Sequence, residues 1–357
     1  MQYHARLGHL RAKMQQQALD SFLVSSRSNV RYLSGFSGSA GLLWVNMEQA
    51  ILYTDFRYEE RAQQEASACD ISIVKGALLD ALVKMPAGTV GRSVGFESAV
   101  LTFKDHNKLS SGLRNVRLLP TESMVEELLE VKDEDEVTCI RQAVKITDQV
   151  FEEVLSWIKP GISEREIAAE IEYRFRKHGG EKASFDTIVA SGKNGSMPHA
   201  AAGDKQIDVG DFVTLDMGTY YKGYASDLTR TVVIGTPTAR QKQVYATVLS
   251  AQQQAIEAAK AGMIASELDA VARNAIAQAG LGGYFGHGLG HGVGLLVHDP
   301  PRVSWMNHKP LKAGMVVTIE PGVYIPGWGG VRIEDIVIIK EDGCEDITSA
   351  PKALISV

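Results

Sequence analysis

The chain has 357 residues, 45% of them hydrophobic, and a formal net charge of −6 at pH 7. This length favours two domains, and this share of hydrophobic residues is enough for ordinary buried cores. The acidic balance offers no basic surface for nucleic acid, and every apolar run is far shorter than the roughly 18 residues typical of a membrane span. We therefore expect neither a nucleic-acid partner nor a membrane partner.

The first third of the sequence is typical of an α/β domain. It opens with a polar helix that places Leu7, Leu10 and Met14 on one face. Five short apolar runs are predicted to be strands: 22–24, 41–45, 50–53, 71–74 and 94–96. Helical stretches alternate with them near 57–67, 77–85 and 102–113. The Gly-rich segment 35–41 lacks the Gly-Lys-Ser/Thr ending of a phosphate loop, so it is predicted to be a plain turn.

A domain boundary is expected between Pro120 and Lys132. The acidic residues that follow favour the start of a long helix, which extends to about Trp157. We therefore divide the chain into domains of residues 1–125 and 126–357. The first domain contains no cluster of titratable ligands, so the second domain is expected to carry the chemistry.

The second domain contains an internal repeat, found by self-comparison of the sequence. Residues 210–218 align without a gap on residues 314–322, an offset of 104 residues (314 − 210). A helix upstream in each copy is expected to end at glycine, at 179–180 and at 280. These helices are also expected to begin with capping boxes, in which Ser163 pairs with Glu166 and Ser266 pairs with Asp269. Two such halves, related by a pseudo-twofold axis, would meet at their acidic residues.

Four acidic residues occupy the predicted hairpin strands of the two copies: Asp216, Asp227, Glu320 and Glu334. A turn at 221–223 places Asp216 directly opposite Asp227, or diagonal to it if the register slips by two residues. The turn at 326–330 repeats this arrangement for the two glutamates. Like charges about 4.5 to 8 Å apart across a hairpin are destabilising. The arrangement therefore requires a cation.

Together with His291, these acids have the composition of a two-metal site. Oxygen ligands with one imidazole suit manganese, cobalt or zinc, and two carboxylate pairs can bridge two ions about 3.5 to 4 Å apart. Any one acid taken alone could instead be a strand-end or turn residue that makes local hydrogen bonds. That alternative is weak for the set, because all five residues lie in three short apolar and Gly-rich segments.

A series of motifs in the second domain completes this picture: Met197-Pro198-His199, Asp216-Met217-Gly218 with Asp227, His287-Gly288-Leu289-Gly290-His291 with His298-Asp299, Glu320-Pro321-Gly322, and Arg332-Ile333-Glu334-Asp335. The series resembles the pita-bread metallopeptidases, above all their Xaa-Pro branch of prolidase and aminopeptidase P. The resemblance implies an α+β fold, with a creatinase-like N-terminal α/β domain before a duplicated pita-bread catalytic domain. Asp299 departs from the Glu of many relatives, which puts substrate preference in question.

By this resemblance, two divalent metal ions, expected to be manganese with cobalt or zinc as alternatives, are held by five ligands: Asp216, Asp227, His291, Glu320 and Glu334. Asp227 would chelate one ion, and His291 with Glu320 would bind the other side of the site. Asp216 and Glu334 would be shared. Water held between two ions becomes a nucleophile near neutral pH. Glu320 would then pass its proton to the leaving nitrogen.

Three further histidines are expected to contact substrate. The resemblance implies that His199 and His298 flank the scissile bond and stabilise the oxyanion, while His287 shapes the pocket. Each could instead be a loop residue that only makes hydrogen bonds. Arg332 shares a strand face with Glu334, so it either orients a ligand or binds the free carboxylate of the substrate. Tyr324 and Trp328 are expected to be packing residues or pocket wall.

The predicted function is hydrolysis of the Xaa-Pro bond at the N-terminus of dipeptides or short peptides. One alternative is an aminopeptidase with wider tolerance at the second position. Another is a non-catalytic peptide-binding protein on the same scaffold. The choice between dipeptidase and aminopeptidase stays open, and a homodimer is a family expectation. A cytoplasmic location is expected because no signal peptide is visible and because the odd set Cys69, Cys139 and Cys344 implies reduced thiols.

Overall fold

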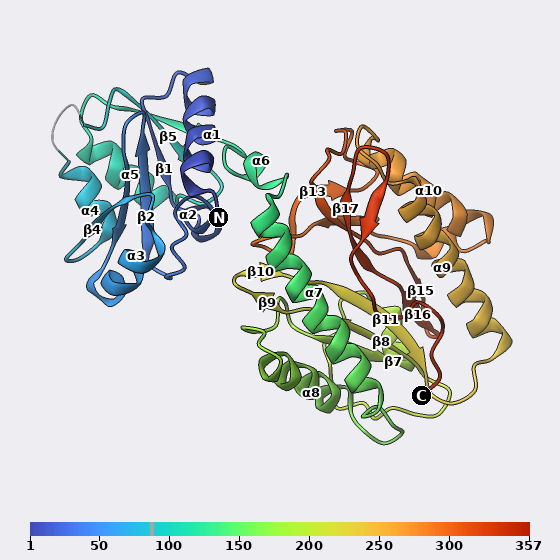
Figure 1. The fold of residues 1–357 in the computed structure, drawn as a ribbon. Coiled ribbons are helices and arrows are strands. Elements are labelled where there is room, and N and C mark those ends of the chain that lie inside the picture. Colours follow the sequence, from blue (N-terminus) through green and yellow to red (C-terminus); the bar gives the residue numbers. More distant parts are fainter. Residues whose placement is uncertain (86–88) are drawn as a thin grey trace. The chain divides into compact units, whose positions relative to one another are not determined.

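The computed structural model describes residues 1–85 and 89–357, which form two compact units, Met1–Leu129 and Glu130–Val357 (Figure 1). Each unit has its own sheets and its own apolar core. No helix in the described part of the chain combines the length and the apolar character needed to cross a bilayer.

The first unit is built on a six-stranded mixed sheet. Its strands are β1 (Ser21–Val24), β2 (Gly41–Asn46), β3 (Ala50–Thr54), β4 (Asp70–Ile73), β5 (Ser93–Glu97) and β6 (Arg117–Thr121). Their order in space is β4-β3-β2-β1-β5-β6. Strand β2 is antiparallel to both β1 and β3, and the other neighbours are parallel. Leu23, Trp44 and Val94 belong to the apolar core of this unit.

The helices of the first unit are α1 (Tyr3–Gln16), α2 (Arg27–Ser34), η1 (Phe56–Tyr58), α3 (Glu59–Glu65), α4 (Leu78–Val83), α5 (Phe103–Gly112) and α6 (Glu126–Leu129). Helix α1 buries Leu7, Leu10 and Met14, as its periodicity predicts. Gly35 ends α2 in the left-handed region, with φ of 86°. Segment 35–41 therefore starts as a helix-terminating turn, in agreement with the prediction.

The first half of the second unit consists of α7 (Glu134–Leu155), α8 (Glu164–Lys177), β7 (Ile188–Ser191), η2 (Gly192–Ser196), β8 (Phe212–Met217), β9 (Tyr220–Tyr221), β10 (Tyr224–Ala225) and β11 (Leu228–Val233). Strands β11, β8 and β7 form an antiparallel sheet in that order. Phe151, Ile171 and Leu215 share one core, so α7 and α8 pack against this sheet.

The second half consists of α9 (Ala239–Ala258), α10 (Ala265–Gln278), η3 (Gly282–Tyr284), β12 (Gly290–Gly292), β13 (Asp299–Val303), β14 (Val316–Ile319), β15 (Gly322–Ile325), β16 (Gly329–Arg332), β17 (Asp335–Ile339) and β18 (Cys344–Asp346). Its main sheet has the order β13-β12-β14-β17-β18. Val248, Leu268 and Val337 share a second core, in which α9 and α10 pack on this sheet (Figure 1). The unit thus repeats one arrangement of two helices and a hairpin-bearing sheet.

The starts of the equivalent helices α8 and α10 differ. Helix α8 begins with the predicted capping box of Ser163 and Glu166. The capping box predicted for Ser266 is wrong, because α10 begins at Ala265 with Ile264 at the N-cap position, two residues before Ser266, and no side chain caps it. The amides of Ala265 and Ser266 donate instead to the carbonyls of Lys309 and Asn307, at 3.1 and 2.9 Å. Backbone acceptors from a neighbouring loop therefore satisfy this helix end.

Candidate metal centre

One cavity of about 1100 Å³ in the second unit is lined by every residue predicted for the site: His199, Asp216, Asp227, His287, His291, His298, Glu320, Arg332 and Glu334. Residues far apart in the sequence therefore come together at the junction of the two halves. The repeat explains this convergence, because each half contributes one hairpin with two acids.

The first hairpin has the diagonal register of the two that the sequence allowed. Asp216 is directly opposite Thr229, two residues beyond Asp227. The turn is centred on Lys222 and Gly223, which both have positive φ, 48° and 80°. Tight hairpin turns of this kind require positive φ at both central residues. The position of the turn therefore sets the offset between the two aspartates.

The second hairpin places its acids face to face. Ile319 pairs with Asp335, and Gly322 pairs with Arg332. Glu320 and Glu334 lie between these pairs, where the ladder β14–β17 ends and the ladder β15–β16 begins. Both residues line the same cavity.

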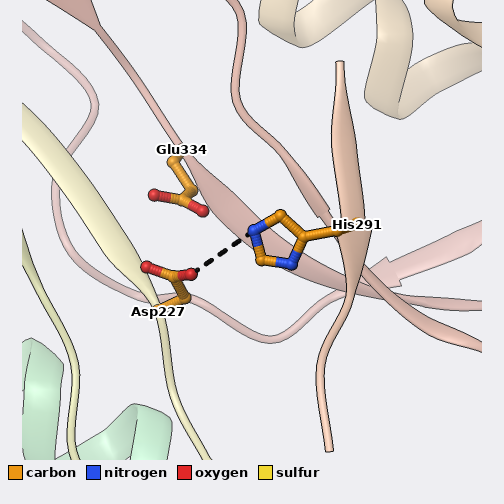
Figure 2. A group of neighbouring side chains, drawn as sticks. All are labelled: Asp227, His291 and Glu334. Atoms are coloured by element: carbon orange, nitrogen blue, oxygen red, sulfur yellow. Dashed lines mark ion pairs between the residues drawn. The ribbon is translucent and has the colours of Figure 1, made fainter. Parts of the chain in front are cut away.

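His291 brings an imidazole to the acids from strand β12. The candidate ligand atoms of Asp227, His291 and Glu334 all lie within 4.8 Å of one another (Figure 2). The Nε2 atom of His291 is 3.6 Å from Asp227 Oδ2 and 3.3 Å from Glu320 Oε1. Its Nδ1 atom lies 3.1 Å from the carbonyl of Gly292. A proton on Nδ1 would satisfy that carbonyl and leave the Nε2 lone pair for a metal ion.

Strand β12 is packed too closely on both sides to carry side chains beside His291. A Cβ atom added to Gly290 would lie 2.0 Å from the carbonyl oxygen of Thr318. One added to Gly292 would lie 2.2 Å from the carbonyl oxygen of Pro300. The backbone of the neighbouring strands therefore fixes the position of the imidazole.

The carboxylates of this site repel one another in a buried setting. Burial, together with the charges of Glu334, Asp216 and Glu320, raises the pKa of Asp227 well above its usual range. Burial and the neighbouring acids likewise raise the pKa of Glu334, and burial raises the pKa of Glu320. A shared cation would remove this repulsion.

The donor set fits a divalent metal ion. It combines hard carboxylate oxygens with one imidazole nitrogen, a combination that suits manganese, cobalt or zinc. Within the described part of the chain, the Oδ1 atom of Asp216 is buried and makes no hydrogen bond. An unsatisfied buried carboxylate oxygen is costly, and a metal ion at this point would satisfy it.

Two threonines, which the sequence analysis missed, orient the acids. Thr229 Oγ1 donates to Glu334 Oε2 at 2.7 Å, and Thr318 Oγ1 donates to Glu320 Oε1 at 3.2 Å. Strand alternation could have indicated both, because each is two residues away from a predicted ligand, Thr229 from Asp227 and Thr318 from Glu320. Hydroxyl donors of this kind hold ligating carboxylates in one orientation.

Arg332 orients other groups of the site, which favours one of its two predicted roles. It is 4% exposed, and its donors contact Asp216 Oδ2, Thr229 Oγ1 at 3.0 Å and Tyr324 Oη at 2.7 Å. Burial alone would lower its pKa, but Tyr324 and the acids outweigh burial, so the pKa of Arg332 lies well above its usual range. Its donors are thus occupied by the protein itself.

A chain of hydrogen bonds links Arg332 to His287 through Tyr324. The His287 Nε2 atom is 2.9 Å from Tyr324 Oη, and its Nδ1 atom is 2.8 Å from the carbonyl of Gly288. Burial raises the pKa of Tyr324 to about 12 and lowers the pKa of His287. Both groups are therefore neutral at pH 7. Trp328 packs edge-to-face against Phe212, as expected of a packing residue.

The remaining predicted histidines lie on the exposed side of the cavity. His199 is exposed and follows η2, and the ring of His298 is 4.4 Å from the ring of His291. Arg302, four residues after His298, also lines the cavity and is exposed. Arg302 lies outside every motif identified in the sequence. Asp299 forms a buried ion pair with Lys132, at 3.7 Å, and is not among the residues that line the cavity.

Comparison with known proteins identifies the family of this chain. Two family models match: Creatinase/Prolidase N-terminal domain over residues 6–131 and metallopeptidase family M24 over residues 138–341. The chain is 43% identical over 350 residues to "Uncharacterized peptidase YqhT" of Bacillus subtilis (strain 168), with 98% of this chain and 99% of the relative covered.

Two solved structures extend the likeness to the whole fold. The Xaa-Pro dipeptidase from Bacillus anthracis matches with a TM-score of 0.96 at 40% identity, over 99% of this chain and 100% of that one. The X-Pro aminopeptidase from Thermotoga maritima MSB8 matches with a TM-score of 0.91 at 38% identity, over 97% and 100%. The predicted family and fold class are confirmed. The chain belongs to metallopeptidase family M24, and its catalytic unit follows an N-terminal domain of the creatinase/prolidase type.

Proposed function

We propose that this protein is a metal-dependent exopeptidase that hydrolyses the Xaa-Pro bond of dipeptides. The observation that carries the metal-dependent chemistry is the convergence of Asp227, His291 and Glu334 within 4.8 Å inside one large cavity. The substrate class is supported by the names of similar structures, an Xaa-Pro dipeptidase and an X-Pro aminopeptidase.

We propose two divalent ions, with manganese as the first choice. We also propose a sharing of the ligands that differs from the one the resemblance implies. Ligand atoms of Asp227, His291 and Glu334 lie within 4.8 Å of one another, so Asp227, which the resemblance assigned to one ion only, would hold metal together with Glu334 and His291. Asp216, oriented by Arg332, would complete one side of the site, and Glu320 beside His291 would complete the other.

The residues around the centre supply positioning and proton transfer. Bound ions would act as a Lewis acid on the scissile carbonyl and would activate water for attack. Glu320, whose pKa is raised by burial, is suited to take a proton and deliver it to the leaving nitrogen. His199 and His298, on the exposed side of the cavity, are suited to hold the scissile peptide. His287 is held through Tyr324 as a neutral donor or acceptor.

Arg302 is the proposed partner of the free carboxylate of a dipeptide. Three arginines line the cavity: Arg165, Arg302 and Arg332. The donors of Arg332 are already used within the site, and Arg165 pairs with Asp204 at 2.6 Å. Arginine is well suited to bind a carboxylate through two parallel hydrogen bonds. Arg302→Gln should therefore raise KM for a dipeptide more than it lowers kcat.

Two alternative functions are considered. An aminopeptidase would accept a chain that continues beyond proline, and the similar aminopeptidase structure supports that possibility. A non-catalytic peptide-binding protein would have no use for buried acids that repel one another, such as Asp227 and Glu334. We therefore favour the enzyme.

The deciding experiment incubates the protein with Mn²⁺ and follows alanine released from Ala-Pro, Ala-Pro-Ala and Ala-Ala-Ala. Cleavage of Ala-Pro alone supports the dipeptidase, and cleavage of Ala-Pro-Ala supports the aminopeptidase. Release of alanine from none of them supports the binding protein. Asp227→Ala and Glu320→Ala should abolish metal-dependent turnover, and full turnover by either variant would show that the assigned site is wrong.

Three further proposals concern the native metal, the oligomeric state and the location of the protein. We propose manganese as the native metal, a homodimer and a cytoplasmic location. Metal analysis of the protein purified without added metal, sedimentation equilibrium and cell fractionation test them in turn. Cys69, Cys139 and Cys344 are all free thiols, and none of them lines the cavity.

A further inference from the structure

Arg230 and Asp335 form a buried ion pair close in the sequence to the candidate metal ligands Asp227 and Glu334. Arg230 follows Thr229, which binds Glu334, and Asp335 follows Glu334 itself. Neighbouring residues of a strand point to opposite faces, so Arg230 and Asp335 point away from the cavity. Arg230 is 1% exposed and Asp335 is fully buried, and their side chains are 2.7 Å apart.

The guanidinium of Arg230 joins three segments of the second unit. Its Nη1 atom donates to the carbonyl of Glu334 at 2.6 Å and to the carbonyl of Thr229 at 3.0 Å. Its Nη2 and Nε atoms donate to the carbonyls of Ala350 and Pro351, at 2.8 and 3.0 Å. One side chain therefore links β11, the segment around Glu334 and the C-terminal segment 347–357.

The C-terminal segment 347–357 adds a second cation to the network. Lys352 Nζ is 2.6 Å from Asp335 and 2.5 Å from Asp346. Gln252 of α9 also donates to Asp335. The segment is held in place, because Tyr245 Oη donates to the carbonyl of Lys352 at 2.9 Å. Buried charges are stable only when they are well paired and hydrogen-bonded, and removing one partner is costly. We therefore expect this network to hold Arg230 in place.

We propose that Arg230, supported by Asp335 and Lys352, is a positioning residue that sets the spacing of the metal ligands. This inference rests on the proposed metal centre. Strands β11 and β17 belong to different sheets, and Asp227 and Glu334 immediately precede them. The distance between the two carboxylates therefore depends on how firmly β11 is tied to the start of β17. Arg230 spans that junction and bonds to the backbone of Glu334 directly.

The test measures metal binding to Arg230→Lys. Lysine keeps the positive charge beside Asp335 but cannot reproduce the planar fork that bonds several carbonyls at once. Calorimetric titration of Mn²⁺ into the metal-free protein should give an affinity about 10- to 100-fold lower than that of the wild type, as for other residues that orient ligands. The visible spectrum of the Co²⁺-loaded protein, which reports ligand geometry, should change as well.

The matched control is Arg174→Lys on α8, where an arginine pairs with Glu153 and Glu170 outside the cavity. It should keep wild-type affinity and a wild-type Co²⁺ spectrum. If Arg230→Lys lowers only the melting temperature and keeps both properties, the residue is merely structural and the inference fails. If the wild type binds no Mn²⁺, the proposed metal centre fails instead.

A second variant covers the case in which Arg230→Lys does not fold. Lys352→Gln removes the outer cation at a partly exposed position and leaves every bond of Arg230 in place. It should weaken Mn²⁺ binding about three- to tenfold, less than the 10- to 100-fold expected for a direct contact of a ligand. Unchanged affinity in a folded Lys352→Gln variant would overturn the proposal that this network sets the spacing of the metal ligands.

Discussion

Replacing Asp227 by Asn should stabilise the metal-free protein while it removes metal binding. Asn keeps the size of the side chain and removes one of the repelling charges. The candidate ligand atoms of Asp227 and Glu334 are within 4.8 Å. Two unit charges at that distance repel by about 3.5 kcal/mol at an effective dielectric constant of about 20. Attraction between Asp227 and Arg332 offsets part of this repulsion.

The stability gained by Asp227→Asn should increase with pH. The folded-state pKa of Asp227 is raised above its unfolded value of about 4. Its contribution to stability is therefore fully present below that unfolded value and is lost as the pH rises through the folded pKa. The advantage of Asp227→Asn should be small at pH 5 and largest at pH 8. For a unit of this size, up to about 3.5 kcal/mol corresponds to roughly 7 to 14 °C in melting temperature.

Calorimetric melting of the EDTA-treated protein at pH 5 and pH 8 measures this effect. Asp186→Asn is the matched control, because Asp186 lines the same cavity but is exposed. That control should change stability by no more than about 0.5 kcal/mol. Saturating Mn²⁺ should raise the melting temperature of the wild type and leave Asp227→Asn unchanged. A metal-free Asp227→Asn protein that melts below the wild type at pH 8 would refute the reasoning.

Three further outcomes are expected. Thr229→Val removes the donor to Glu334, so Mn²⁺ affinity measured by calorimetry should fall about 10- to 100-fold, whereas Thr247→Val on α9 should leave it unchanged. Tyr324→Phe removes the hydroxyl that links Arg332 to His287. Steady-state kinetics should show about a tenfold loss of kcat while the metal content stays the same. An unchanged kcat would contradict a role of this link in catalysis. Because the pKa values of Asp227 and Glu334 are raised, Mn²⁺ must displace protons from these carboxyl groups. The affinity for Mn²⁺ should therefore rise from pH 5 to pH 8. Calorimetric titration in two buffers of different ionisation enthalpy measures the protons released, and no release would contradict this prediction.

The sequence predicted the parts of the fold that local chemistry determines. The buried face of α1, the capping box of α8 and the glycine that ends α2 follow from periodicity and end signals. Helix α2 was missed, although Val30 and Leu33, three residues apart, share its buried face. Strand β6 was missed because it contains Pro120, which only the edge position of β6 in the sheet tolerates.

The candidate site was predictable as a set of residues but less so as a geometry. The spacing of acids in two hairpins indicated which side chains converge, and all of them line one cavity. The register of the first hairpin was left open, although positive φ at Lys222 and Gly223 decides it. Arg302, an exposed residue of β13, was not recognised, because an exposed arginine carries no distinctive sequence signal. Its candidacy depends on the pairing of the other two arginines of the cavity, which only the structure shows.

The two glycines beside His291 enlarge the set of harmful mutations to positions that carry no functional group. A single methyl group at Gly290 or Gly292 would collide with backbone atoms, which cannot rotate out of the way. In a genetic screen for lost activity, alanine at these positions should therefore appear beside the ligand substitutions, in a chain that still folds elsewhere. Alanine scanning that skips glycine would overlook them, and so would any search for active-site residues based on reactive side chains.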